Sequence, residues 1–172
     1  ETASYFVGEA GNYEMSDGTK ITLGTVSSNG LSSNTHELTF DIGSSLTNPA
    51  VFTQIQTNND SNWVVTRVRN VTSSEFTLSL QEQESFSSHS HGDETVGYLA
   101  IEKGSNKSNG SHTIDVGETS NSYTHSTRSQ SFGTTFSETP ALIVKMATRD
   151  GGDASNVRTT SISDSSFISV GD

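Results

Sequence analysis

A cluster of histidines and acids stands in the middle of the chain, in the sequence HSHGDE at residues 89–94. Alternate residues of an extended segment point to the same side, so His89 and His91 can bind a divalent metal together with the carboxylate of Glu94. Short clusters of this kind are also common in ordinary polar loops, and that interpretation is the more frequent one. The sequence therefore predicts a candidate metal site here, with a structural loop as the favoured alternative.

Two loops at matching places in the chain carry oxygen ligands of the kind that calcium prefers. The sequence RDGGDASN contains Asp150, Asp153 and Asn156, and NNDSN at residues 58–62 contains Asp60. Carboxylate and amide oxygens on a glycine-flexed loop suit calcium, although the spacing is not that of an EF-hand. The alternative is a hairpin turn whose aspartates cap their own backbone, and we favour it slightly.

Two arginines recur at matching places, in a chain with only nine Lys and Arg residues. Arg67 and Arg158 could each clamp a carboxylate or sulfate of a polysaccharide, or pair with a neighbouring glutamate. The structural ion pair is the better interpretation, and its candidate partners are Glu82, Glu84 and Glu94. Trp63 shares a strand face with Arg67 and Arg69 and could stack on a sugar ring. The candidate ligand-binding residues are Trp63, Arg67, Arg69 and Arg158.

Motifs for catalysis are not found in the sequence. It contains no nucleophile elbow, no HExxH and no glycine-rich phosphate loop. Pairs of carboxylates can be drawn anywhere on so acidic a chain, so they carry no weight. We therefore expect a protein that is not an enzyme.

The composition limits the classes of partner. The 172 residues carry a net charge of −11, which disfavours binding to nucleic acid or to anionic membranes. No apolar run approaches the roughly 18 residues that a membrane span needs. The absence of cysteine excludes disulfides and thiolate metal sites. An acidic chain rich in Ser, Thr and Asn is typical of a soluble protein, and we expect it to be secreted or to lie at the cell surface.

Short apolar runs separated by turn residues predict β-strands. Phe76, Leu78 and Leu80 alternate with polar residues, as a half-buried strand requires. Val51, Thr53 and Ile55 share one face of AVFTQIQT, and Leu142, Val144 and Met146 share one face of ALIVKMAT. TVGYLAIE is more continuously apolar, which is typical of a strand buried on both faces. No segment shows a helical period, so we expect an all-β protein built as antiparallel β-sandwiches.

The chain contains an internal repeat with a period of about 91 to 93 residues. Pro49 and Pro140, Ala50 and Ala141, Thr57 and Thr148, Arg67 and Arg158, and Phe76 and Phe167 are each 91 positions apart, whereas Ile21 and Ile114, and Gly24 and Gly117, are 93 apart. The repeat predicts two tandem sandwich units. We call residues 12–104 the first unit and residues 105–172 the second unit.

The first eleven residues copy the end of the first unit. ETASYFVGEAG at residues 1–11 shares Glu, Thr, Tyr, Glu and Gly, in register, with ETVGYLAIEKG at residues 94–104. The second unit lacks a counterpart of that strand, and a sandwich without a strand leaves backbone unpaired. Residues 1–11 could close the second unit of their own chain, insert into a neighbouring subunit, or reflect a cut through a longer array. We favour the first.

The sequences PAVFTQIQT, VVTRVRNVTSSEFTLSL and ETVGYLAIEKG together resemble the H-type lectin domain. They also resemble related repeat modules of large secreted and surface proteins of marine bacteria. The similarity covers most of residues 36–104 and, more weakly, residues 131–170. It implies six-stranded antiparallel sandwiches and sugar binding at subunit interfaces. The units are longer than that domain, and a complete sugar site does not align.

The leading functional prediction is a non-catalytic, extracellular carbohydrate-binding or adhesive module that uses calcium, with a polysaccharide or glycan as its partner. The alternative is a structural subunit of an extracellular filament or surface array. That subunit would form homo-oligomers by strand exchange through residues 1–11.

Overall fold

The computed structural model describes residues 6–30, 37–82, 91–121, 123–150 and 155–171. Every regular element among these residues is a β-strand. The strands are β1 Gly11–Glu14, β2 Lys20–Ser28, β3 Leu38–Asp41, β4 Pro49–Ile55, β5 Val64–Arg69, β6 Glu75–Glu82, β7 Glu94–Glu102, β8 Gly104–Asn109, β9 His112–Val116, β10 Arg128–Ser131, β11 Val157–Ile162 and β12 Ser166–Gly171. The predicted all-β class is confirmed. No helix that could cross a membrane occurs among these residues.

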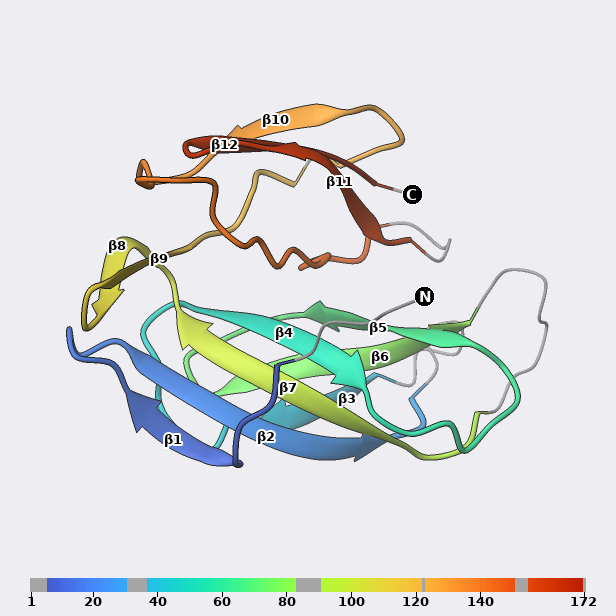
Figure 1. Ribbon diagram of the computed structural model, residues 1–172. Coiled ribbons are helices and arrows are strands. Elements are labelled where there is room, and N and C mark those ends of the chain that lie inside the picture. The colour runs from blue at the N-terminus through green and yellow to red at the C-terminus, as the bar shows by residue number, and fades with distance from the viewer. Residues whose placement is uncertain (1–5, 31–36, 83–90, 122, 151–154, 172) are drawn as a thin grey trace.

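The first unit is a two-layer antiparallel sandwich. One sheet has the strand order β1-β2-β7-β4 and the other has the order β3-β6-β5 (Figure 1). β7 lies between β2 and β4 and pairs with both, with Gly24 opposite Tyr98 on one side and Thr53 opposite Tyr98 on the other. This central position explains why its sequence is apolar on both faces.

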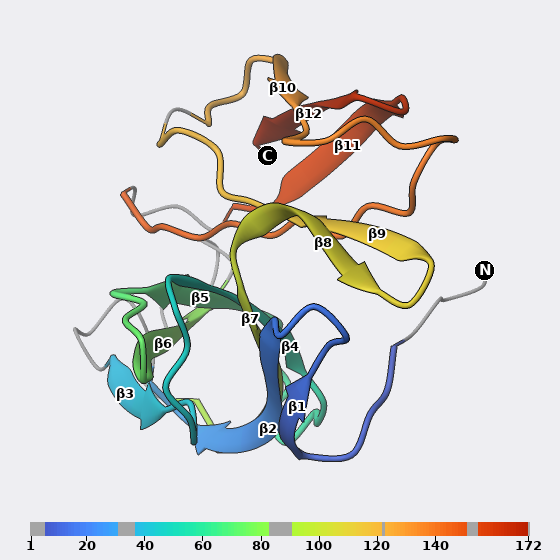
Figure 2. The same cartoon turned by 90° about the vertical axis from the view of Figure 1, so that its left-hand side faces the viewer.

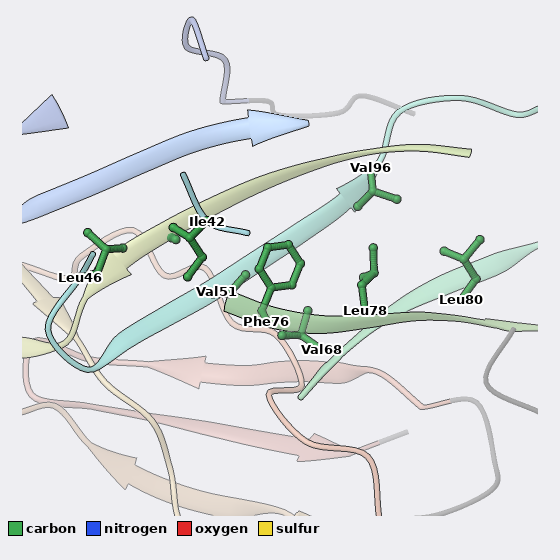
Figure 3. Close-up of a cluster of buried hydrophobic side chains, with 9 residues drawn as sticks. Ile42, Leu46, Val51, Val68, Phe76, Leu78, Leu80 and Val96 are labelled. Atoms are coloured by element: carbon green, nitrogen blue, oxygen red, sulfur yellow. The ribbon is translucent and has the colours of Figure 1, made fainter. Parts of the chain in front are cut away.

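The core of the first unit lies between these two sheets (Figure 3). Nine buried apolar residues form it, and they are Ile42, Leu46, Val51, Val68, Phe76, Leu78, Leu80, Val96 and Ala100. The predicted inward faces of β4 and β6 supply Val51, Phe76, Leu78 and Leu80 to this cluster. Thr77, Ser79 and Gln81 are buried as well, so β6 is covered on both faces although its alternation predicts cover on one.

The second unit matches one sheet of the first. Its sheet has the order β10-β12-β11, as β3-β6-β5 has in the first unit. The turn contacts also match, because the N–H of Ile42 donates to Ser74 O (2.7 Å) and the N–H of Phe132 donates to Ser165 O (2.8 Å). In addition, the β8–β9 hairpin opens the second unit as β1–β2 opens the first (Figure 2).

Two predicted strands are not strands in the structure. Residues 139–150 contain the sequence that matches β4, yet they form no strand, and neither do residues 6–10. In the first unit β4 pairs with β7 alone. The described part of the second unit has no strand at the matching position, so residues 139–150 lack the partner that would order them in a ladder.

The two units meet at the outer face of the sheet β1-β2-β7-β4. Met15 and Ile101 of the first unit form a buried cluster there with Val116 of β9. Partly buried apolar side chains surround this cluster, and they are Ile21, Ala50, Phe52, Leu99 and Ile114. The β1–β2 turn also bonds the β8–β9 hairpin, since Asp17 Oδ2 accepts from the N–H of Ser108 in β8 at 2.7 Å.

Candidate functional site

The carboxylate of Glu94 holds the loop between β4 and β5. Its Oε1 accepts hydrogen bonds from the N–H groups of Asn59 (2.8 Å) and Asp60 (3.3 Å), and its Oε2 accepts one from the Thr57 hydroxyl. Burial opposes the charged form, but these donors outweigh it and lower the pKa of Glu94. Both oxygens of this predicted metal ligand therefore have partners within the protein.

His91 is buried beside this loop and lies between two carbonyl groups. Its Nδ1 lies 2.9 Å from the oxygen of Gly92, and its Nε2 lies 3.2 Å from the oxygen of Asn62. Carbonyls only accept, so both contacts are hydrogen bonds at once only when the ring carries two protons. Burial disfavours the charged ring, but the two carbonyls and the nearby Asp60 and Glu94 outweigh it and raise the pKa of His91.

The His91 contacts predict a pH-dependent stability. Because the folded-state pKa is raised, the contribution of His91 is fully present below the ordinary histidine value of about 6.5 and is lost as pH rises through the raised pKa. We expect His91→Ala to be most destabilising near about pH 6 and less so above about pH 8. Urea midpoints of both proteins across this range measure the effect. An equal difference at every pH would contradict the assignment.

The remaining candidate metal ligands are scattered. Asp150 and Asn156 are exposed, and Asp150 Oδ2 lies 3.4 Å from the Thr148 hydroxyl, which donates to it. Asp153 and His89 lie outside the described residues. Among the residues that the structure describes, no three His, Asp or Glu side chains are grouped so that they could hold a metal. Calcium binding at the 150–156 loop stays a prediction.

Arg67 connects the two units. Its guanidinium donates to the carbonyl oxygen of Ser155 (2.8 Å), to the Ser155 hydroxyl (2.8 Å) and to the carbonyl oxygen of Thr148 (3.1 Å). The residue is 4% exposed. Burial, followed by the nearby Arg149, lowers the pKa of Arg67. The structure thus places this predicted ligand-binding arginine in contacts within the protein, and its bonding partners are not the glutamates expected from the sequence.

We expect Arg67→Ala to loosen the second unit from the first. The change removes three charge-assisted donors at the contact between the units and leaves the Thr148 carbonyl without this partner. Amide hydrogen exchange is expected to speed up in residues 145–150 and to stay unchanged in β6. Arg67→Lys should rescue only part of the protection, because an ammonium lacks the fork of donors. Arg128→Ala, on exposed β10, is the charge control and should change neither segment.

The other two candidate arginines lie at the surface. Arg69 pairs with Glu37, whose second oxygen lies 3.5 Å from Nη1 of Arg149. Glu37 therefore lies between one arginine of each unit. Arg158 is exposed on β11, and this strand belongs to a different sheet from β5, which carries Arg69. The four predicted ligand-binding residues do not form one site through the strand pairings.

Trp63 is the most exposed large apolar side chain among the described residues, with 84% of its surface accessible. It immediately precedes β5 and lies at the border of a space of about 1840 Å³ that extends between the two units. Asn58 and Asn62 border the same space. An exposed indole and carboxamides that border one space suit a polar ligand with an apolar face.

Tyr98 is a structurally important residue whose role the sequence reasoning missed. Its hydroxyl donates to the carbonyl oxygen of Ile42 (3.0 Å), and its ring contacts Phe76 with a centroid distance of 5.3 Å. Gly24 makes room for it, since a Cβ at position 24 would lie 2.5 Å from the Tyr98 hydroxyl oxygen. The signal was present in the sequence, because the glycine and the tyrosine both recur, at Gly117 and Tyr5.

Comparison with known proteins gives one informative similarity. The chain is 39% identical over 103 residues to halomucin of Haloquadratum walsbyi (strain DSM 16790 / HBSQ001). The match covers 59% of this chain and 1% of halomucin. No family model matches the chain, and no solved structure matches it significantly. The resemblance to H-type lectins stays a prediction.

Proposed function

We propose that the chain is a non-catalytic carbohydrate-binding module of an extracellular surface protein. The observation that carries this proposal is Trp63, an aromatic platform that is 84% exposed at the border of the space between the units. The similarity to a short part of a protein named halomucin supports the extracellular setting. The net charge of −11 agrees with a soluble secreted protein.

The proposed contact is a sugar ring stacked on the indole of Trp63. One face of a pyranose presents C–H groups, which pack against an aromatic ring, while its hydroxyls seek amide partners. The exposed carboxamide of Asn58 borders the same space and is a candidate for that task, whereas the carboxamide of Asn62 donates to Glu82 Oε1 (3.3 Å). Arg67 is not assigned to the ligand, because its donors bond Ser155 and Thr148.

Trp63→Ala is expected to reduce glycan binding by about tenfold or more, because truncation of a buried aromatic anchor commonly costs about 1.4 kcal/mol or more. Trp63 is the single tryptophan of the chain, so a stacked sugar should also shift its fluorescence directly. A glycan array that includes acidic polysaccharides, with and without a chelator, measures binding and its dependence on calcium. Tyr13→Ala, at an aromatic residue that is 43% exposed, is the matched control. Equal glycan binding by Trp63→Ala and Tyr13→Ala would contradict the proposal.

A further inference from the structure

In β7, the residues that are repeated at the N-terminus have identifiable structural roles. Glu94 holds the β4–β5 loop, and Tyr98 fills the space over Gly24. Glu102 accepts from the N–H groups of Thr47 (2.7 Å) and Lys20 (3.1 Å), which ties the ends of the flanking strands. Residues 1–9 carry the same three side chains at the same spacing, as Glu1, Tyr5 and Glu9. The shared residues are therefore those that a strand needs in this central position.

The second unit presents receptors for these side chains. Gly117 matches Gly24, and a Cβ built there would meet nothing within 4 Å. Phe132 matches Ile42, whose carbonyl accepts the tyrosine hydroxyl in the first unit. Thr148 matches Thr57, whose hydroxyl bonds the buried glutamate, so the Thr148 hydroxyl would exchange its present contacts with Asn121 (3.2 Å) and Asp150 (3.4 Å) for one with Glu1. Residues 1–5 lie outside the described residues, and residues 6–9 form no strand in this structure. We propose that residues 1–9 pair as the missing central strand of the second unit, between β9 and residues 140–147, with Tyr5 over Gly117.

The exposed apolar residues of the chain support this assignment. In β7, Ala100 points into the core of its unit and Leu99 points to the contact between the units. Val7 and Phe6 hold the matching positions, and they are 79% and 70% exposed. Ile143, which matches Phe52, is 69% exposed. Insertion of the strand buries all three in the space of about 1840 Å³ that Phe6, Val7 and Ile143 line.

The occupant is the chain's own N-terminus rather than a second copy. Ile101 of β7 and Val116 of β9 belong to one buried cluster, and their matches are Gly8 and Leu23. A Cβ at Gly8 would lie 2.6 Å from a methyl of Leu23, so residue 8 already lies against β2 of its own chain. Ile21 and the matching Ile114 both pack on the same cluster, which places the outer faces of the two units against each other.

Because the outer faces of the two units lie against each other, one chain can supply the central strand of both units. β7 completes the first unit and leads at Gly104 into the hairpin of the second. The proposed strand completes the second unit and leads at Gly11 into the hairpin of the first. Each unit thus receives a central strand that continues into the other. The inference goes beyond the proposed carbohydrate binding and does not depend on it.

A double-mutant cycle between Gly117 and Tyr5 tests the strand. If Tyr5 lies over Gly117, Gly117→Ala lowers the urea midpoint in the wild-type background, as Gly24→Ala does, and has little effect in a Tyr5→Ala background. If the position is vacant, Gly117→Ala has no effect in either background, and the proposal is overturned. Tyr5→Phe, which keeps the ring and loses the hydroxyl, should retain most of the coupling.

Hydrogen exchange and sedimentation distinguish the two possible sources of the strand, which are the chain's own N-terminus and a second copy of the chain. We expect the wild-type protein to be a monomer in which the amides of residues 141–147 exchange at least about tenfold more slowly than in Tyr5→Ala, since strand pairing protects them. The amides of β4, which serve as the internal control for folding, should not change. Rapid exchange in 141–147 of the wild type would overturn the proposal. Protection that appears only in oligomers would overturn it too, in favour of a strand from a second copy.

Discussion

Gly24→Ala is expected to lower the free energy of unfolding by about 1–3 kcal/mol, the usual cost of overpacking a core. The new Cβ would lie 2.5 Å from the hydroxyl oxygen of Tyr98 and 2.6 Å from two of its ring carbons. The ring cannot move aside freely, because it packs against the buried ring of Phe76 and its hydroxyl bonds Ile42. Urea unfolding, followed by circular dichroism, measures the change.

The cause of this loss can be isolated with a second substitution. In a Tyr98→Ala background the clash is absent, so adding Gly24→Ala should cost little and can even stabilise the strand, since glycine weakens strand interiors. Tyr98→Ala alone is destabilising, because it opens a cavity beside the core. Strict additivity of the two changes would show that Gly24 does not serve to accommodate Tyr98.

Phe76→Ala is expected to cost about 3–5 kcal/mol, the largest effect of any single change considered for this chain. Phe76 is fully buried in the core of the first unit (Figure 3). Its ring contacts those of Phe40 and Tyr98. Removing the ring loses its transfer free energy and leaves a cavity that strands on both sides cannot fill. The urea midpoint should fall sharply while far-UV dichroism of any remaining folded protein stays that of β-structure.

Leu38→Ala is the matched control for this prediction. Leu38 lies opposite Leu78 on the neighbouring strand β3, but it is 38% exposed. Its loss should cost clearly less than that of Phe76, because less apolar surface leaves the interior. Equal costs at the two positions would mean that the core does not lie between the sheets as described.

The strands of the first unit can be predicted from the sequence, and each of them finds its partner strands within that unit. The alternation in residues 75–81 and 51–55 correctly assigns Phe76, Leu78, Leu80 and Val51 to one core. The apolar character of TVGYLAIE correctly indicates a central strand. These patterns can be recognised because successive side chains of a strand point to opposite faces. A strand with one buried face therefore has an apolar residue at every second position.

Pattern alone could not assign the polar residues. Arg67, Glu94 and His91 are chemically suited to a ligand or a metal, but the structure bonds them to backbone groups of loops distant in sequence. Such loop contacts have no periodicity that a sequence reveals. The β4-like segment at residues 140–147 shows a different limit, since its residues suit a strand but a strand also needs a neighbour with free backbone groups. The copy of ETVGYLAIEKG at residues 1–11 is the feature of the sequence that pointed to such a neighbour.

An engineered disulfide tests most directly whether the N-terminal strand completes the second unit of its own chain. Ala100 lies opposite Val51 in the first unit, and the matching residues are Val7 and Leu142. The chain has no cysteine of its own. We predict that Val7→Cys with Leu142→Cys in one chain oxidises to a crosslinked monomer, whereas Phe6→Cys with Leu142→Cys, whose side chains belong to opposite faces, does not. Failure of the first pair to crosslink, or crosslinks formed only between chains, would contradict the account.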